Sequence, residues 1–230
     1  MLKQLKFIGQ SALQIVYPDC CFVCGNDLVR SENHLCATCE YDLPFLSSTE
    51  DEVNRLAKLF YGRVNIEKVY SLFNYQKGNA VQIILHQIKY KNKTKIAEHF
   101  GKVLGNKING LHTFDCIVPV PLHAKKLNKR GFNQSSIIAS GLAKVLNIPV
   151  YDNCIRRITH NKSQTKFSKY DRFENVRKIF ELNQPELIRN KHVLLVDDVL
   201  TTGATIEACA SEILHAENCK VSIATLAVRI

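Results

Sequence analysis

The sequence lacks any long apolar run. No stretch of its 230 residues approaches the ~18 apolar residues needed to span a bilayer, so we expect no membrane-spanning segment. Internal repeats and low-complexity linkers are absent as well, so a repeat architecture is not expected. The composition, 46% apolar and 23% charged, is ordinary for a soluble globular protein. A chain of this length has room for one α/β domain with a small appendage.

The first residues lack the cleavage site of a secretory leader. Polar residues interrupt the apolar stretch, and no small-x-small pattern follows it. Its apolar residues instead fit one face of a short helix that ends before Pro18. This favours a helix packed on the protein, with a membrane-surface helix or a signal peptide as the alternatives.

Acidic residues are outnumbered, and the formal charge is +10. Such a charge points to polyanionic partners, either nucleic acid or phosphorylated metabolites, unless the basic residues only form a solvated face.

The sequence contains nine cysteines, an odd number that cannot all pair in disulfides within the chain. Five crowd into Cys20–Cys39, and the other four are scattered in apolar contexts. This distribution favours a metal site in a reducing cytoplasm over a disulfide framework.

The crowded cysteines form two Cys-x2-Cys pairs separated by eleven residues. They are Cys21, Cys24, Cys36 and Cys39. Four thiolates satisfy tetrahedral Zn²⁺ and leave no open position, so the predicted zinc site is structural. Cys20 is an alternative to Cys21, and His34 is a possible competitor for the metal. An iron–sulfur centre or redox-active thiols are the other interpretations of the cluster.

Short apolar runs in the second half of the chain alternate with helical patterns. Expected strands are Asp115–Val120, Lys191–Val196 and Lys220–Val228, with Tyr70–Tyr75 as a weaker edge strand; expected helices are Ala80–Tyr90, Ile96–Leu104, Asn133–Leu146 and Thr202–Glu217. Runs rich in β-branched residues suit a buried parallel sheet, and strand–helix–strand order implies right-handed crossovers. The fold class is therefore α/β, a parallel sheet flanked by helices. We place the cysteine module in residues 1–48 and this domain in 49–230.

A phosphate-binding element is expected where the strand Val193–Val196 stops at two acids. A loop of small residues then opens a helix, and its free N–H groups and positive dipole end suit an anion. The loop comprises Thr201, Thr202, Gly203, Ala204 and Thr205. It contains no lysine, so it is not a Walker A sequence. Asp197 and Asp198 can only accept hydrogen bonds, which suits sugar hydroxyls. Together the loop and the acids describe a site for a ribose 5-phosphate.

Basic residues concentrate in three clusters: residues 89–95, 125–130 and 156–178 hold sixteen of the 31 lysines and arginines. Aromatic residues lie among them, a pattern that suits a single strand with its phosphates and stackable bases. Core aromatics beside solvated charges are the other interpretation. The segment Val118–Gln134, which carries Lys129 and Arg130, is a candidate for contacts with pyrophosphate or nucleic acid, unless it is a solvated basic loop.

The stretch VLLVDDVLTTGAT at Val193–Thr205 resembles the phosphoribosyl-diphosphate (PRPP) motif of type I phosphoribosyltransferases. The resemblance implies that Asp197 and Asp198 hold the ribose and that the TTGAT loop holds the 5-phosphate. It also implies Mg²⁺, bridging pyrophosphate and ribose oxygens. Nothing in the sequence identifies a segment that would recognise an acceptor base.

The order of motifs along the whole chain is similar to that of the ComF family of competence proteins, of the ComFC type. Those motifs are the paired Cys-x2-Cys, Ile88–Lys91, the VPVPLH…KRGFNQ block, the Gln164…Arg172 block and DDVLTTGAT. The resemblance implies natural transformation, with internalised single-stranded DNA handled in the cytoplasm beside competence helicase or recombination proteins. The pyrophosphate or DNA candidates are Lys89, Lys129, Arg130, Gln134, Gln164 and Arg172. The alternative is an active Mg²⁺-dependent phosphoribosyltransferase of nucleotide metabolism unrelated to DNA uptake.

Overall fold

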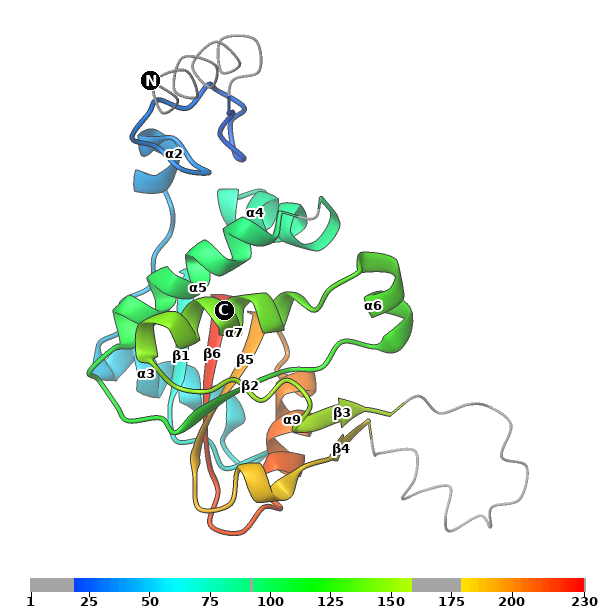
Figure 1. Ribbon diagram of the computed structural model, residues 1–230. Coiled ribbons are helices and arrows are strands. Elements are labelled where there is room, and N and C mark those ends of the chain that lie inside the picture. Colours follow the sequence, from blue (N-terminus) through cyan, green and yellow to red (C-terminus); the bar gives the residue numbers. More distant parts are fainter. Residues whose placement is uncertain (1–18, 92, 159–178, 230) are drawn as a thin grey trace, which may run out of the picture.

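The computed structural model describes residues 19–91, 93–158 and 179–229. Within them a parallel sheet of four strands runs in the order β1 (Val69–Asn74), β6 (Lys220–Val228), β5 (His192–Leu200) and β2 (Cys116–Pro119). Almost every residue of these strands is buried, because helices cover both faces (Figure 1). The weakly alternating run around Tyr70 does form the expected edge strand, β1.

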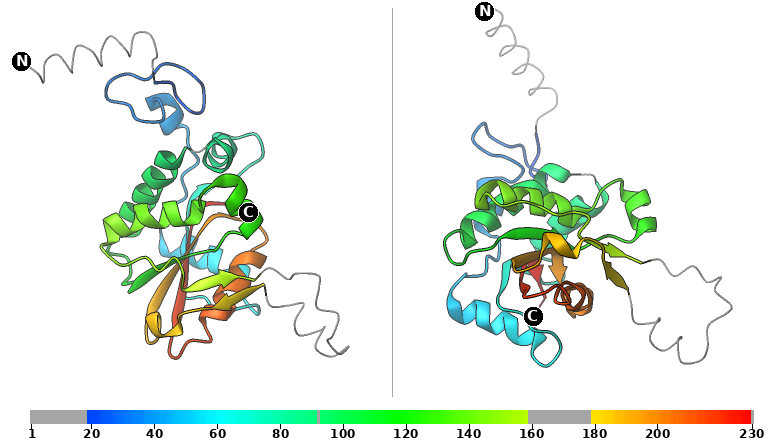
Figure 2. Two further views of the ribbon diagram at one scale, coloured as in Figure 1. Left: turned by 45° about the vertical axis from the view of Figure 1, so that its right-hand side comes forward. Right: turned by 60° about the horizontal axis from the view of Figure 1, so that its bottom comes forward.

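The helices divide between the two faces of the sheet. The longer ones are α3 (Glu50–Ala57), α4 (Ala80–Tyr90), α5 (Thr94–Ile108), α7 (Gln134–Leu146) and α9 (Ala204–Ile213); short elements are α2 (Ala37–Tyr41), α6 (Ala124–Arg130), η1 (Lys58–Phe60) and η2 (Pro185–Leu187). Apolar side chains of α4, α5 and α7 share one core with one face of the strands. Those of η1 and α9, with Leu56 and Ala57 of α3, share the second core with the other face, whereas Val53 of α3 belongs to the first core. Figure 2 shows the resulting layers from two further directions.

Helices α5 and α7 cross with almost no side chain between their backbones. A Cβ at Gly101 would lie 2.4 Å from the Ile138 carbonyl oxygen, and a Cβ at Gly141 would lie 2.3 Å from the Glu98 carbonyl oxygen. Both distances are far below van der Waals contact, so only glycine fits at either position. The crossing fixes where α7 begins, and therefore where Gln134 and Ser135 meet the sheet.

The cysteine module joins the sheet through the segment after α2. Phe45 forms an antiparallel bridge with Phe73 of β1, and their ring centroids are 4.9 Å apart. Backbone hydrogen bonds on either side of the bridge run from Leu46 N to Leu72 O and from Asn74 N to Pro44 O. Buried side chains of the module, Cys21 among them, belong to the same core as α4 and α5. No helix in the described ranges is long and apolar enough to cross a membrane.

The strand that carries the acids is longer than the sequence indicated. We expected it to end at Val196, but β5 continues through Asp197 and Asp198 to Leu200. The ladder with β6 persists there, with Asp197 opposite Thr225 and Leu200 opposite Val228, so the acids stay in register with a buried neighbour. The expected helix Thr202–Glu217 is shorter at both ends. Gly203 adopts a left-handed conformation and delays the start of α9 to Ala204, and α9 ends at Ile213.

A helix and a pair of strands are among the elements that were not predicted. The basic segment expected as a loop contains the helix α6, which a left-handed Gly131 terminates. The antiparallel pair β3 (Ile155–Arg157) and β4 (Phe180–Leu182) flanks residues outside the described ranges. The expected N-terminal helix lies outside them too. The predicted fold class, a parallel α/β sheet flanked by helices, is confirmed.

Candidate functional site

Two adjacent carboxylates form the centre of the candidate site, in the last third of β5. Asp198 is buried, with 4% of its surface exposed, and Asp197 is partly buried. Ser135 donates its hydroxyl proton to Asp197 Oδ1 at 2.9 Å, and the Asp198 backbone N–H donates to the same oxygen at 2.9 Å. Buried carboxylates need such donors, because an unpaired charge away from water is costly.

The second carboxylate is held by two side chains from different helices. Gln134 Nε2 of α7 lies 3.1 Å from Asp198 Oδ2, and Lys89 Nζ of α4 lies 3.1 Å from the same oxygen. Lys89 and Gln134 were both predicted as site residues, and both lie at the acid pair. The α4 helix also borders the cysteine module, since its residues Ile83 and Gln87 line a hollow together with residues of the module.

The ionisation of Asp197 is shifted by its surroundings. Burial raises the pKa of Asp197 to about 7, and the neighbouring charge of Asp198 adds to this rise. Hydrogen bonds from the Asp198 N–H and from Ser135 oppose it, as does the charge of Lys89. A carboxylate that ionises near neutrality is a strong acceptor for hydroxyl groups as soon as its proton leaves, which suits a ribose diol.

Hydrogen bonds of Asn133 hold the start of α7, where Gln134 lies. Asn133 caps the helix by accepting from the Ser135 N–H at 3.2 Å, and its amide donates to the Val120 carbonyl at 3.0 Å. Gln134 is 5% exposed, and its Oε1 is a buried acceptor without a hydrogen-bond donor within the described residues. An unmet acceptor beside the acids is suited to a ligand hydroxyl or N–H group.

The TTGAT loop follows directly after the acids. Gly203 adopts φ 77°, and its carbonyl accepts the Glu207 N–H at 2.8 Å, which begins the helical hydrogen bonds of α9. Thr201, Thr202, Ala204 and Thr205 are exposed around a small hollow of about 40 Å³ that Asp197 also lines. The backbone N–H groups at the start of α9 and the threonine hydroxyls are donors for an anion. The Ala204 N–H makes a long contact of 3.5 Å with Thr202 Oγ1.

Arg63 supports this loop from behind and was missed by the sequence reasoning. Its Nη1 donates to the Thr202 carbonyl at 3.0 Å and to the Leu59 carbonyl at 3.1 Å, and its guanidinium pairs with Glu207. Phe60 also lies against the loop, since a Cβ at Gly203 would be 3.1 Å from its ring. The sequence offered no signal for this support, because Arg63 is far from the loop along the chain and lies in no motif.

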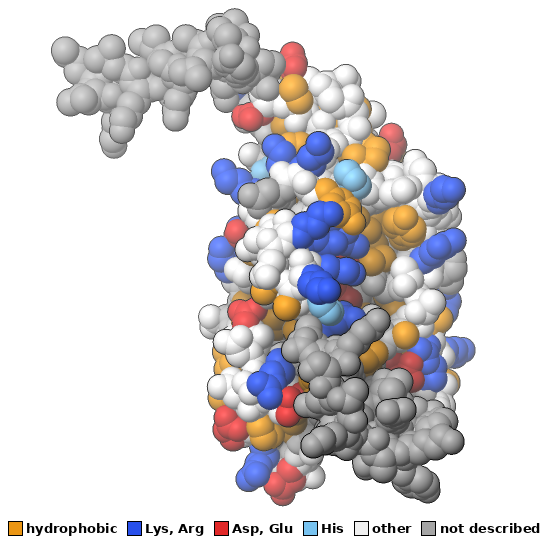
Figure 3. All heavy atoms as spheres, turned by 90° about the vertical axis from the view of Figure 1, so that its right-hand side faces the viewer, with side chains coloured by type: hydrophobic (Ala, Val, Ile, Leu, Met, Phe, Trp, Pro, Cys, Tyr) orange, Lys and Arg blue, Asp and Glu red, His pale blue; other side chains and the backbone are white. Residues whose placement is uncertain are grey.

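The other residues predicted to contact pyrophosphate or DNA are not described at the acid pair. Arg130 lies over the ring of Tyr90 at 5.3 Å, so the end of α6 meets the end of α4. Lys129 is exposed on α6. It stays a predicted contact for pyrophosphate or DNA. Gln164 and Arg172 lie outside the described residues. Figure 3 shows lysine and arginine side chains gathered along this face, with histidine and hydrophobic side chains among them.

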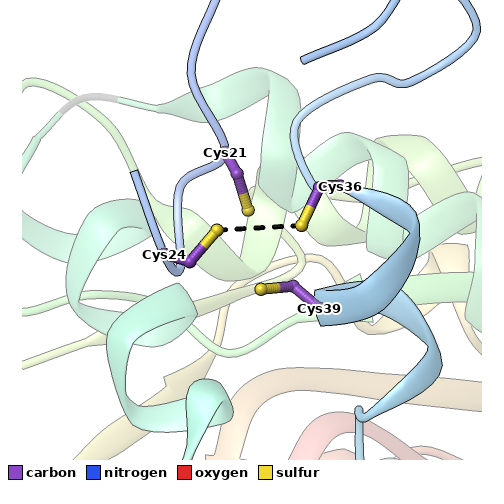
Figure 4. Close-up of side chains that lie close together, drawn as sticks. All are labelled: Cys21, Cys24, Cys36 and Cys39. Atoms are coloured by element: carbon purple, nitrogen blue, oxygen red, sulfur yellow. Dashed lines mark hydrogen bonds between the residues drawn. The ribbon is translucent and has the colours of Figure 1, made fainter. Parts of the chain in front are cut away.

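The four cysteine sulfurs converge on one point, as Figure 4 shows. All four lie within 4.8 Å of one another, and Cys24 Sγ is 3.7 Å from Cys36 Sγ. Zinc bound by four thiolates at ~2.3 Å would separate neighbouring sulfurs by about 3.8 Å, so the group has the size of a tetrahedral zinc site.

Local backbone structure places each cysteine pair. Gly25 turns the first pair with φ 80°, while Cys36 precedes α2 and Cys39 lies on it. Burial opposes ionisation of Cys21, but backbone N–H groups of Cys24, Cys36 and Val23 outweigh it and lower its pKa to about 6. A stabilised thiolate fits a metal ligand.

Neither Cys20 nor His34 belongs to the converging group. Cys20 Sγ lies 3.8 Å from Asp27 Oδ1 and is not a member of the converging group, whereas Cys21 is. The imidazole of His34 stacks on the ring of Phe22 at 5.6 Å instead of joining the sulfurs.

Comparison with known proteins shows which proteins this chain resembles. Residues 133–230 match the model of the phosphoribosyl transferase domain. Competence protein F of Haemophilus influenzae is 26% identical over 200 residues, which cover 81% of this chain and 86% of that protein. Competence protein ComFC of Bacillus subtilis is 24% identical, with 89% of this chain and 82% of that protein covered. DNA utilization protein YhgH of Escherichia coli K12 is 30% identical, over 57% of this chain and 60% of that protein.

Solved structures give more distant likenesses. The glutamine PRPP amidotransferase of B. subtilis aligns with a TM-score of 0.42 and 19% identity, over 56% of this chain and 25% of that chain. The purine phosphoribosyltransferase of Pyrococcus horikoshii aligns with a TM-score of 0.37 and 21% identity, over 57% of this chain and 72% of that chain.

Proposed function

Because this chain is a ComF-type, phosphoribosyltransferase-like protein, we propose that it binds PRPP and acts in DNA uptake, handling internalised single-stranded DNA in the cytoplasm. One observation carries the PRPP part of the proposal. The acid pair near the end of β5 is followed closely by the TTGAT loop, which leads into α9, and Asp197 lines the same hollow as the loop, so a sugar-hydroxyl acceptor and phosphate donors face one another there. A ribose 5-phosphate satisfies both at once.

Each group at the site has one role in this proposal. Asp197 and Asp198 accept hydrogen bonds from the ribose hydroxyls, and the N–H groups and hydroxyls of the loop donate to the 5-phosphate. Lys89 and Gln134 lie at Asp198 and would meet the pyrophosphate side of the ligand. Magnesium, when bound with PRPP, would neutralise pyrophosphate charge; the acids beside Lys89 are compatible with such a cation.

The DNA part of the proposal rests on the basic face and on the named relatives. Lys91, Lys93 and Lys95 are exposed at the end of α4 and the start of α5, and Tyr90 is 56% exposed among them. Exposed cations next to an aromatic ring suit the phosphates and bases of a single strand. The relatives are named for competence and for DNA utilisation, which supports the same class of substrate. Competence helicase or recombination proteins are the partners this role would require.

A second candidate function is catalysis by the same site, as a Mg²⁺-dependent phosphoribosyltransferase. The intact acid pair and the unmet Gln134 Oε1 favour a site that holds a reactive ligand. In the reaction a nucleophile would form a bond to the anomeric carbon as the bond to pyrophosphate breaks. Positioning and electrostatics would supply most of the catalysis. The structure offers no described segment that would identify the acceptor.

Two measurements test the proposal. Fluorescence anisotropy with a labelled oligothymidylate should show binding that weakens steeply with salt, because each neutralised phosphate releases counterions; a flat response at low salt would end the DNA role. PRPP with Mg²⁺ should then be incubated with bases, nucleosides and DNA while released pyrophosphate is measured. Release that depends on one acceptor favours the enzyme, and PRPP binding without release favours the binding protein.

A further inference from the structure

A groove of about 1060 Å³ separates the cysteine module from helices α4 and α5. It is distinct from the hollow at the acid pair, and the PRPP proposal does not use it. The module contributes Phe22 and His34, α4 contributes Ile83 and Gln87, and the start of α5 contributes Lys95. The volume lies slightly above the usual range for ligand-binding clefts, which is ~300–1,000 Å³.

An aromatic platform lies in this groove. The rings of Phe22 and His34 stack at 5.6 Å with an interplanar angle of 15°, and His99 meets His34 edge-on at 5.7 Å. The backbone of His34 is strained, with φ 69°, and the Phe22 N–H donates to the His34 carbonyl at 3.0 Å. A strained residue held in place beside an open groove is a pattern typical of functional sites.

Cations border the platform. Lys93 Nζ lies 4.8 Å from the centre of the Phe22 ring, and Lys95 is exposed on the next turn of chain. Two acidic residues, Asp19 and Glu32, also line the groove. The Glu32 carboxylate already accepts the N–H groups of Val29 at 2.9 Å and Ala37 at 2.7 Å, whereas Asp19 is exposed. The amide of Gln87 adds a donor and an acceptor for the edge of a base.

We infer that this groove is a base-stacking subsite for single-stranded DNA. A base stacks on the Phe22–His34 platform in place of the Lys93 ammonium, and Lys93 and Lys95 then meet the adjoining phosphates. The inference rests on the proposed DNA role and assigns it a place on the molecule. Since α4 lines the groove at Ile83 and carries Lys89 to Asp198, the strand would lie within one helix of the PRPP site.

The sequence contains no tryptophan, so a single introduced one reports on the groove alone. In Phe22→Trp, oligothymidylate should quench the fluorescence as bases stack on the indole. In Tyr61→Trp, on the opposite side of the sheet and 67% exposed, the same titration should leave the fluorescence unchanged. Zinc content and circular dichroism equal to wild type establish that both variants fold. Unquenched indole fluorescence in a Phe22→Trp protein that still binds the oligonucleotide would overturn the inference.

Affinity gives the second test. Phe22→Leu should weaken oligothymidylate binding about tenfold, because one stacked base is lost. Lys93→Ala/Lys95→Ala should lower the slope of log K against log salt by about 1.4, from ~0.7 per phosphate contact on a single strand. Lys58→Ala/Lys220→Ala removes two exposed lysines outside the groove and should change neither. If wild type binds and the groove variants match it, the subsite is wrong while the DNA role stands; if wild type does not bind, the DNA role itself fails.

Discussion

Lys89 Nζ lies 3.1 Å from Asp198 Oδ2, and the two side chains come from helix α4 and strand β5 on either side of the candidate site. The Asp198 side chain is 6% exposed and the Lys89 side chain 22%. The pair is therefore shielded from water far more than a surface ion pair, and it ties the acids to the helix that also borders the cysteine module.

Removing Lys89 should destabilise the protein, because the buried Asp198 carboxylate would lose its cation. In Lys89→Met, Asp198 keeps the Gln134 amide but loses its cation, so we expect the free energy of unfolding at pH 7.5 to fall by about 1–3 kcal/mol. In an Asp198→Asn background the same substitution should cost much less. Guanidinium unfolding of the four proteins measures this, and an equal cost in both backgrounds would show that the pair does not interact.

The pH dependence of stability should report Asp197. Its pKa is about 7 in the folded protein, against ~3.9 in an unfolded chain. Between those values the folded state keeps a proton that the unfolded state has released. Stability from this residue is thus complete below pH ~4 and is lost as the pH rises through 7.

The variant Asp197→Asn removes that dependence while keeping an oxygen for Ser135 and for the Asp198 N–H. We expect it to be more stable than wild type by on the order of 1 kcal/mol at pH 8, with a smaller difference at pH 5.5. Urea unfolding at the two pH values tests this, and a difference that does not grow with pH would contradict the raised pKa.

The glycine crossing of α5 and α7 should be intolerant of even a methyl group. Gly141→Ala puts a Cβ 2.3 Å from the Glu98 carbonyl oxygen, so the helices must separate. We expect a loss of more than about 2 kcal/mol of unfolding free energy, as in other overpacked interiors. Ser140→Ala, one residue earlier on α7, is the control and should change stability by less than about 0.5 kcal/mol. Thermal unfolding of both variants measures whether the loss of stability is specific to the position at the helix crossing. Similar midpoints for the two variants would argue against close packing of α5 and α7.

Metal binding should depend on Cys39 and not on Cys20. Cys39→Ser removes one of the converging sulfurs, whereas Cys20→Ser changes a side chain that faces Asp27. Metal analysis of the purified proteins should give one zinc per chain for wild type and Cys20→Ser, and much less for Cys39→Ser, with lower thermal stability. Zinc lost equally in both variants would mean that Cys20 is a ligand.

Sequence patterns predicted the parts of the candidate sites whose residues are close together in the sequence. The TTGAT loop and the acids lie within nine residues, and each Cys-x2-Cys pair within four, so their geometry follows from local turns. The buried strands and the helices α4, α5 and α7 were readable for the same reason, because hydrophobic periodicity reflects burial. The extension of β5 past Val196 was not, since it depends on how far β6 continues beside it.

Contacts between distant segments could not be read in that way. Arg63 reaches Thr202 and Glu207 from just after η1, and no motif marks it. Ser135, which bonds Asp197, follows Gln134 directly, yet a serine at the first turn of a helix is too common to stand out. The groove beside Phe22 exists because the module packs against α4 and α5, a relationship that no single segment encodes.

The most direct test of the account is calorimetric titration of the full chain with PRPP and Mg²⁺ at pH 8, where Asp197 is ionised. Wild type should bind in the micromolar range, and Asp197→Asn/Asp198→Asn should lose binding while remaining folded by circular dichroism. The exposed-lysine variant Lys58→Ala/Lys220→Ala should bind as wild type does. Absence of PRPP binding by wild type, or undiminished binding by the double-asparagine variant, would contradict the assignment of the acid pair and the TTGAT loop.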